Sequence, residues 1–168
     1  RPTEQERAYP WLRRYIVRLP RLGEIGLFER SWYTRVLLER VEGLCREEDW
    51  ARAFQEINQT EEMLVRDGAI FVKIWLHITK KQQRRSLKAA EKDPFRQFTV
   101  TRAEWKRHEK YREYARAAEE MLERTSTHLA PWRIVEAADE HYRRMRVLQI
   151  CCEALVNGLN AHEERQAR

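Results

Sequence analysis

Cysteine is scarce in this sequence, and the placement of the three cysteines argues against the common cysteine-based sites. Cys45 stands alone, and Cys151 and Cys152 are adjacent within an apolar helical stretch. Zinc sites and disulfide frameworks use cysteines at characteristic separations, so neither class is indicated. We expect three buried free thiols, which suit a reducing compartment such as the cytoplasm.

Long hydrophobic runs are also absent. No window of about 18 residues is apolar and uncharged, so the sequence predicts no membrane-spanning helix. The first residues do not have the pattern of a signal peptide. Because the sequence starts at Arg1 rather than at a methionine, we expect a preceding segment to be missing.

Glycine is rare, and no glycine belongs to a phosphate-binding loop. The pattern GxxxxGK[ST], whose backbone amides cradle phosphates, does not occur in the chain. None of the five glycines is followed by lysine; they are Gly23, Gly26, Gly43, Gly68 and Gly158. If this is a P-loop protein, its P-loop lies outside these residues or has been lost.

Charge is abundant and mainly positive. The chain has 33 Lys and Arg against 27 Asp and Glu, a net charge of +6. Hydrophobic residues make up 42% and charged residues 36%, which is typical of a soluble globular protein and not of a disordered one. The 168 residues suffice for one domain with a core. The basic balance suggests a polyanionic partner without identifying it.

Helical segments alternate with short apolar ones along the chain. We predict strands at 23–28 (GEIGLF), 69–78 and 132–138, and helices at 3–19, 36–44, 49–67, 80–92, 102–124 and 139–159. This alternation is typical of an α/β fold with a mainly parallel sheet. Asp49, Thr79 and Thr101 are expected to cap helix starts, and Gly68 a helix end. Three strands make a thin sheet, so further strands are expected before Arg1.

An acid and two arginines follow the first predicted strand. Glu29 lies at its carboxyl end, where open parallel sheets bind ligands. A carboxylate there can hold Mg²⁺, and Arg30 and Arg35 can neutralise phosphate oxygens with their planar guanidinium groups. A solvated strand end with a local ion pair is the alternative, and the spacing leaves both open.

A second candidate is the basic segment that follows the 69–78 strand. Residues 80–96 contain seven cations and two acids, a local charge of +5. A mobile basic helix after a strand can close over phosphates as a lid. A solvated helical face is the alternative. The seven cations are Lys80, Lys81, Arg84, Arg85, Lys88, Lys92 and Arg96.

Four stretches resemble the type-two polyphosphate kinase family and occur in the family's order. They are PWLRRYIVRLPRLGEIGLFERSWYTRVLLERVEG (10–43), EINQTEEML (56–64), VKIWLHITKKQQRRSLKAAEKDP (72–94) and TSTHLAPWRIVEAAD (125–139). The blocks RSWY to ERVEG and TST to APW are specific. The resemblance covers nearly the whole chain.

The resemblance implies a three-layer, P-loop-kinase-like α/β fold with a parallel sheet, a helical lid at about 79–100, and a single domain over 1–168 that is incomplete at its N-terminus. It also implies Mg²⁺-dependent phosphoryl transfer between inorganic polyphosphate and a nucleotide of the AMP, ADP or GDP class. By this analogy Glu29 takes the place of the metal-binding acid, and Arg30, Arg35 and Arg85 are catalytic. The remaining lid cations, Lys80, Lys81, Arg84, Lys88, Lys92 and Arg96, would bind polyphosphate.

The chain departs from the family pattern at several charged positions. Glu29 stands where the family has aspartate, and Ala90 where it has an arginine. Phe98-Thr99 replaces a Trp-Lys pair, and Glu140 replaces a lysine. Because the loss of one charged donor can cost about 10²–10³ in rate, these departures suggest a weakened or inactive site.

Three hypotheses follow from the sequence. The first is an active polyphosphate-dependent phosphotransferase whose P-loop lies upstream. The second is a degenerate first domain of a tandem phosphotransferase, serving as a polyphosphate-binding module or dimer scaffold. The third, a basic domain that binds nucleic acid, has little support because no nucleic-acid motif is recognised. The outer faces of the long helices could support a homo-oligomer.

Overall fold

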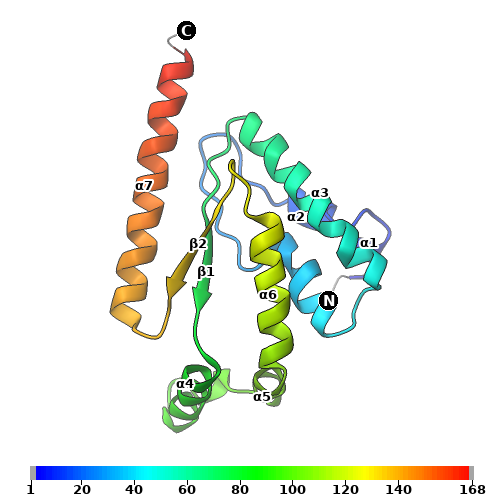
Figure 1. Cartoon of the computed structure of the whole chain (residues 1–168), viewed down its shortest axis with the longest axis vertical. Helices are drawn as coiled ribbons and strands as arrows, with labels where there is room; N and C mark the ends of the chain where they lie inside the picture. The colour runs from blue at the N-terminus through cyan, green and yellow to red at the C-terminus, as the bar shows by residue number, and fades with distance from the viewer. Residues whose placement is uncertain (1–2, 167–168) are drawn as a thin grey trace.

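The computed structural model describes residues 3–166 as a mixed α/β chain in which helix predominates (Figure 1). The strands are β1 (Lys73–His77) and β2 (Trp132–Glu136). The helices are α1 (Glu4–Arg7), α2 (Arg13–Ile16), α3 (Glu47–Arg66), α4 (Lys80–Lys92), α5 (Arg102–Glu109), α6 (Tyr111–Thr125) and α7 (Glu140–Gln166). Shorter helical turns are η1 (Ser31–Thr34), η2 (Arg35–Glu39) and η3 (Gln97–Thr99).

The two strands form a parallel pair, as the alternation of helices and strands predicts. Lys73 pairs with Trp132 at one end and His77 with Glu136 at the other. Side chains alternate across a strand, so Lys73 and Trp132 share one face while Val135 points to the opposite face. The parallel arrangement is confirmed, although the described residues contain two strands and not three.

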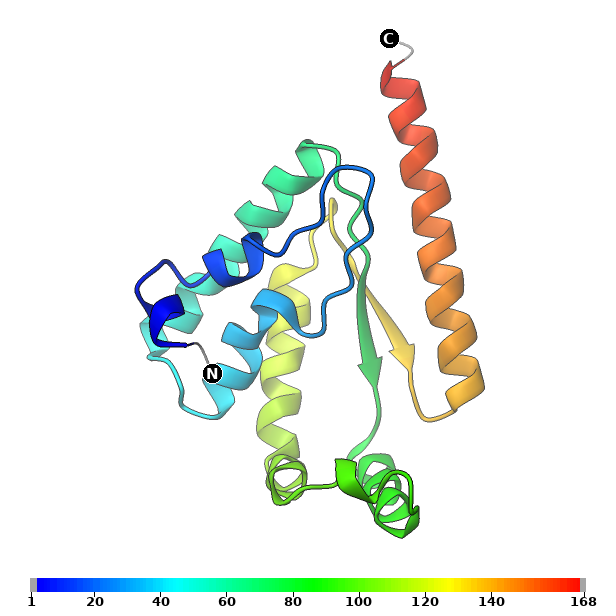
Figure 2. The ribbon, with the colours of Figure 1, turned by 180° about the vertical axis from the view of Figure 1, so that it is seen from behind.

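Helices cover both faces of this small sheet (Figures 1 and 2). On one face a hydrophobic core joins η1, η2, α3 and α6, and Trp75 and Trp132 of the strands pack against it. The buried residues of this core are Trp32, Tyr33, Val36, Ala53, Phe54, Ile57 and Met121. On the other side α7 runs along β2, with Ile150 buried. The layered arrangement therefore agrees with the expected three-layer fold.

The predicted strand at 23–28 is wrong. These residues have irregular backbone and all are exposed, and the side chain of Leu27 is 93% exposed. The prediction rested on apolar composition, but a strand also requires a neighbour to pair its backbone groups. No segment within residues 3–166 pairs with it. Glu29 consequently follows a loop and not a strand.

Several helix boundaries also differ from the prediction. The expected helix over 3–19 is divided into α1 and α2, because Pro10 lacks a backbone donor and disfavours helical geometry in the residue before it. The helix expected over 102–124 is divided into α5 and α6 at Lys110, whose ψ of 13° leaves the helical range. Asp49 lies in the first turn of α3, whose N-cap is Arg46.

Other local predictions are confirmed. Thr79 caps α4 and Thr101 caps α5, each accepting a hydrogen bond from a backbone N–H of the first turn. Gly68 has a φ of 101° just after α3, a conformation that glycine adopts readily. Among the described helices, none combines the length and apolarity needed to cross a bilayer.

The cysteines are free, but they are not all buried. Cys45 and Cys151 are half-buried, and Cys152 is exposed on α7. The expectation of a buried Cys152 is wrong because only one side of α7 lies against the rest of the chain. The apolar residues around Cys152 extend around the helix, so composition did not reveal which side is buried.

A buried polar network ties four elements of the core together. Glu61 is 1% exposed and Lys73 is 5% exposed, and Lys73 Nζ lies 2.8 Å from Glu61 Oε2. Lys73 also donates to the carbonyl oxygen of Thr125 at 2.5 Å. The indole N–H of Trp32 and the hydroxyl of Tyr33 both donate to Glu61 Oε1. The network links α3, β1, η1 and the end of α6.

Burial shifts the pKa values of two ionisable side chains in this network. It lowers the pKa of Lys73, an effect that the adjacent Glu61 carboxylate opposes. It also raises the pKa of Tyr33, and Glu61 adds to that increase. Tyr33 therefore stays protonated as a donor to Glu61 at neutral pH.

We expect Lys73→Met to lower the free energy of unfolding by about 3–5 kcal/mol, because it leaves the buried Glu61 carboxylate uncompensated. The double variant Lys73→Met with Glu61→Gln should recover more than half of the loss. Urea unfolding measures both. The control is Arg66→Met, which removes the exposed ion pair of Arg66 with Glu62 and should cost less than about 1 kcal/mol. Equal losses in the single and double variants would contradict this account.

Candidate functional site

A tight turn at Glu29, Arg30 and Ser31 precedes η1. Arg30 has a φ of 62° and Ser31 a φ of 42°, and the Ser31 N–H donates to the Glu29 carbonyl oxygen at 2.7 Å. Left-handed backbone at a residue other than glycine costs about 1–3 kcal/mol, and such residues cluster at functional sites. Two of them in succession mark this turn as a candidate site.

The residues that follow the turn hold it in place. Trp32 and Tyr33 are buried, and both donate hydrogen bonds to Glu61. The Tyr33 ring also lies 4.7 Å from the ring of Trp132, centroid to centroid. The core thus anchors the turn on the side that leads into η1.

The side chains of Glu29 and Arg30 face solvent. Glu29 is 84% exposed at its side chain, and its carboxylate lies 3.1 Å from the guanidinium of Arg30. Within residues 3–166, no three His, Cys, Asp or Glu side chains come together as a metal cage. Mg²⁺ is commonly held by one or two carboxylates, with substrate phosphates and water completing its coordination. The donor set fits that mode and not an all-protein cage.

Arg35 has a different environment. Its guanidinium lies 3.1 Å from Glu39 and 5.0 Å from the ring centroid of Trp11, and it is largely buried. Glu39 also pairs with Arg14 at 2.5 Å. These contacts give Arg35 a role in holding η2 against the N-terminal helices, and they provide no support for the expected catalytic role.

The basic helix α4 lies at the end of the molecule toward which both strands point (Figure 1). Its first turn is fixed by a capping box between Thr79 and Gln82, and it ends at Asp93, just before Pro94. All seven cations of the segment are exposed. Of the ion pairs formed between described residues, none involves these cations. Their charge is therefore available to an anion.

Helix α4 is attached to α5 by a small set of side chains. His108 Nδ1 lies 2.8 Å from Gln83 Oε1, and the indole N–H of Trp105 donates to Glu91 at 2.7 Å. Ala90, next to Glu91 on α4, is also buried. Burial, followed by the nearby charges of Lys80 and Arg84, lowers the pKa of His108. A neutral imidazole thus supports the inner side of the basic helix.

A further group near Arg30 was not predicted from the sequence. The hydroxyl of Tyr114 donates to Glu42 at 2.8 Å, and Lys110 Nζ lies 3.2 Å from the same carboxylate. Burial and the Glu42 carboxylate raise the pKa of Tyr114 to about 12, and Arg30 acts in the opposite direction. Tyr114 of α6 therefore lies within electrostatic range of Arg30. No sequence signal links these residues, because Tyr114 and Glu42 are 72 positions apart.

The positions that depart from the family pattern have local contacts in this chain. The hydroxyl of Thr99 donates to the carbonyl oxygen of Arg96 at 2.7 Å, and Glu140 pairs with Arg144 at 2.5 Å on α7. Phe98 is exposed beside Thr99. None of these contacts presents a cation to the turn.

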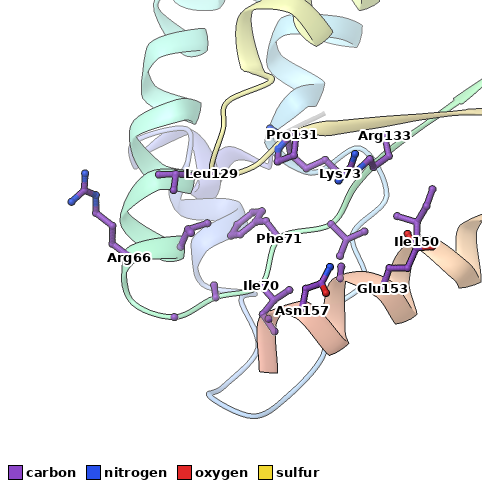
Figure 3. A pocket seen from close by; sticks show the side chains of 16 residues that line it. Arg66, Ile70, Phe71, Lys73, Leu129, Pro131, Arg133, Ile150, Glu153 and Asn157 are labelled. Carbon is purple, nitrogen blue, oxygen red and sulfur yellow. The ribbon is translucent and has the colours of Figure 1, made fainter. Parts of the chain in front are cut away.

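A cavity lies elsewhere, away from the turn and from α4. It has a volume of about 600 Å³ and lies between the end of α3, the amino ends of the strands and α7 (Figure 3). Its lining includes Ile70, Phe71, Arg133, Glu153 and Asn157. No predicted site residue lines it, so it is distinct from the turn and from α4.

We expect the stability of the chain to fall as the pH drops below about 6.5, the ordinary pKa of histidine. Because the pKa of His108 is lowered in the folded chain, the unfolded chain takes up a proton first and is favoured. The loss should level off once the pH reaches the folded pKa. Urea unfolding from about pH 7.5 to 5 should show this slope, and His108→Gln should remove it. The control is His141→Gln, which replaces an exposed histidine and should leave the dependence of stability on pH unchanged. If His108→Gln also leaves that dependence unchanged, its assignment to His108 is refuted.

Known proteins resemble the chain over most of its length. The polyphosphate:AMP phosphotransferase of Pseudomonas syringae pv. tomato is 44% identical over 154 residues, covering 92% of this chain and 31% of that protein. The GDP-polyphosphate phosphotransferase of Mycolicibacterium smegmatis is 35% identical over 149 residues, covering 89% of this chain and 53% of that protein. The chain spans about a third to a half of the length of these relatives.

The structural comparison agrees. The crystal structure of a putative polyphosphate kinase 2 from Pseudomonas aeruginosa matches with a TM-score of 0.91 at 42% identity, covering 95% of this chain and 34% of that one. Residues 1–163 match the family described as Polyphosphate kinase 2 (PPK2). The resemblance and the P-loop-kinase-like fold expected from the sequence are confirmed, and the chain belongs to the polyphosphate kinase 2 family.

Proposed function

We propose that this chain takes part in Mg²⁺-dependent phosphoryl transfer between inorganic polyphosphate and a nucleoside mono- or diphosphate. The observation that carries the proposal is the exposed basic helix α4, whose cations have no ion-pair partner among the described side chains and lie at the end toward which the strands point. The proposal is supported by the relatives, which are named polyphosphate:AMP phosphotransferase and GDP-polyphosphate phosphotransferase. The free cysteines suit a cytoplasmic setting.

The spacing of the cations on α4 fits a linear polyanion. Lys80, Arg84, Lys88 and Lys92 recur every four residues, so they form one stripe about 18 Å long on a helix that rises 1.5 Å per residue. Like charges four residues apart destabilise a helix. A bound polyphosphate chain would relieve that repulsion and would explain why the stripe is kept free of acids.

The turn and helix α4 would each supply different groups to phosphoryl transfer. Glu29 would hold Mg²⁺, which supplies neutralisation of phosphate charge when it is bound. Arg30 would contact the transferring phosphoryl group with its planar guanidinium, and Arg85 would approach it from α4. Phosphoryl transfer relies on positioning and charge stabilisation, roles that a strained, anchored turn and an exposed cationic helix can supply.

A second candidate function is a degenerate polyphosphate-binding domain. Ala90 is buried, so an arginine there would have to displace its neighbours, and Glu140 presents an acid already paired with Arg144. In this second candidate function α4 still binds polyphosphate, but the domain does not transfer phosphoryl groups.

One experiment separates the two candidates. The chain is titrated with polyphosphate at two salt concentrations, and AMP or ADP with Mg²⁺ is added to the same samples to detect ADP or ATP. Salt-sensitive binding with product supports phosphotransfer, and binding without product supports the degenerate domain. The absence of binding would overturn the role of α4.

We expect Arg84→Gln with Lys88→Gln to weaken polyphosphate binding and to reduce the slope of log affinity against log salt by about two, one for each cation removed. Fluorescence anisotropy with labelled polyphosphate measures both quantities. The control is Arg112→Gln with Arg116→Gln, which removes two exposed arginines from α6. Equal effects of the two double variants would show that binding follows net charge alone.

We expect Glu29→Gln to abolish Mg²⁺-dependent product formation while polyphosphate binding without Mg²⁺ persists, because only the proposed metal contact is lost. Glu29→Asp should retain or increase turnover, since it restores the family residue. A coupled assay for ADP or ATP, run over a series of Mg²⁺ concentrations, measures the turnover of both variants. Unchanged turnover in Glu29→Gln would exclude Glu29 as the metal residue.

A further inference from the structure

Two phenylalanine rings lie in solvent on the segment that joins α4 to α5. Phe95 is 92% exposed and Phe98 is 80% exposed. Neither ring packs against another aromatic ring of the described residues. Folding normally removes large apolar side chains from water, because that transfer is favourable. Two such rings three residues apart therefore indicate a surface that binds a ligand or a partner.

The backbone that carries the two rings is held by hydrogen bonds. The Asp93 carboxylate accepts from the N–H of Phe95 at 2.9 Å. The Asp93 carbonyl oxygen accepts from the N–H groups of Arg96 and Gln97, and the Arg96 carbonyl oxygen accepts from the N–H of Thr99 at 2.9 Å. Side chains three residues apart in such tight helical turns lie on the same side. We therefore expect both rings on one side of a hydrogen-bonded segment.

The charges available beside the rings are positive. Arg96 lies between the two rings in the sequence, and Lys92 precedes them at the end of α4. Both cations are exposed. The two acids of this stretch already accept hydrogen bonds: Glu91 from the indole N–H of Trp105 at 2.7 Å, and Asp93 from a backbone N–H. The segment thus combines exposed cations with exposed aromatic rings.

A nucleotide is the kind of ligand that uses both features. Cations bind its phosphates, and an aromatic ring can stack on its base, because every base has a π face. An inorganic polyphosphate would use the cations and would gain nothing from the rings. An apolar peptide would use the rings and would gain nothing from the cations. The combination therefore favours a nucleoside phosphate over either alternative.

We propose that Phe95 and Phe98 form a stacking surface for the nucleobase of a nucleoside phosphate, whose phosphates are bound by Lys92 and Arg96. This inference rests on the proposed function, in which a nucleotide is one of the two substrates. The nucleotide would lie at the end of the cation stripe of α4 that Lys92 occupies, so a polyphosphate bound along the stripe would lead toward the nucleotide's phosphates (Figure 1). Because stacking uses the face of the base and not its edges, the surface favours purines over the smaller pyrimidines and does not distinguish adenine from guanine.

Isothermal titration calorimetry of the 168-residue chain with ADP and with inorganic pyrophosphate, both without Mg²⁺, tests the surface. The two ligands carry the same two phosphates, and only ADP has a base. The double variant Phe95→Leu with Phe98→Leu retains apolar bulk and removes the π faces. We expect it to weaken ADP binding at least about fivefold and to change pyrophosphate binding by less than about twofold.

Two comparisons make this test specific. The matched control is Tyr9→Leu, which removes an exposed aromatic ring next to α1 and should leave both affinities unchanged. The unaltered chain should bind ADP and GDP within about twofold of each other and CDP more weakly. The double variant should lose the difference between ADP and CDP. Circular dichroism verifies that the variants remain folded.

Proton NMR of the unaltered chain detects the stacking directly. The ring current of a stacked base moves the resonances of a phenyl ring upfield. ADP should therefore shift the ring resonances of Phe95 and Phe98, which the two single leucine variants assign, and pyrophosphate should not. The fully buried Phe54 is the internal reference and should not move with either ligand.

Three results would overturn the proposal. One is equal weakening of ADP and pyrophosphate binding by the double variant, which would give the rings a role in the structure of α4 and not in base recognition. Another is ADP binding that the double variant leaves unchanged, without a shift of either ring, as expected if another polypeptide segment covers the rings. The third is an unaltered chain that binds pyrophosphate as tightly as ADP.

The failure of this surface is distinguishable from the failure of the proposed function. In each of those three results the chain still binds phosphate, so the role proposed for α4 stands while the base site is lost. If the unaltered chain binds neither ADP, pyrophosphate nor polyphosphate, the proposed function is overturned and the stacking surface with it.

Discussion

The buried ion pair between Glu61 and Lys73 is the interaction on which the rest of the structure depends. Two charges removed from water are costly unless their remaining hydrogen-bonding capacity is used. Here Glu61 accepts from Lys73, Trp32 and Tyr33, and Lys73 also donates to Thr125. Because the partners come from η1, α3, β1 and the end of α6, the pair fixes how these elements meet.

That arrangement explains how a strained turn can exist beside a small sheet. The positive φ angles of Arg30 and Ser31 are unfavourable in isolation, but the residues that follow them are buried and bonded to Glu61. The side chains of Glu29 and Arg30 are left in solvent, where the proposed function would have them meet Mg²⁺ and a phosphate. Buried contacts therefore hold the turn on the side that leads into η1, while its charged side chains face solvent.

The basic helix α4, unlike the turn, is only weakly anchored to the rest of the chain. It has few anchors, chiefly His108 with Gln83 and Trp105 with Glu91, and it displays cations that repel one another. A segment with few buried contacts opens at low energetic cost, which suits a lid over a polyanion. Helix α7 differs from both, since apolar side chains such as Met145 and Leu148 lie in solvent on the side away from β2.

The sequence alone determined the features that depend on a few adjacent residues. The caps at Thr79 and Thr101, the glycine at 68 and the apolar strand that begins at Trp132 follow from local chemistry, and the family could be identified from contiguous blocks. The tertiary structure alone decided that 23–28 is an exposed loop, that Arg35 pairs with Glu39, and that Glu61 meets Lys73. Each of these depends on whether a partner distant in the chain is available to pair or to bury the group, and composition and periodicity carry no information about distant partners.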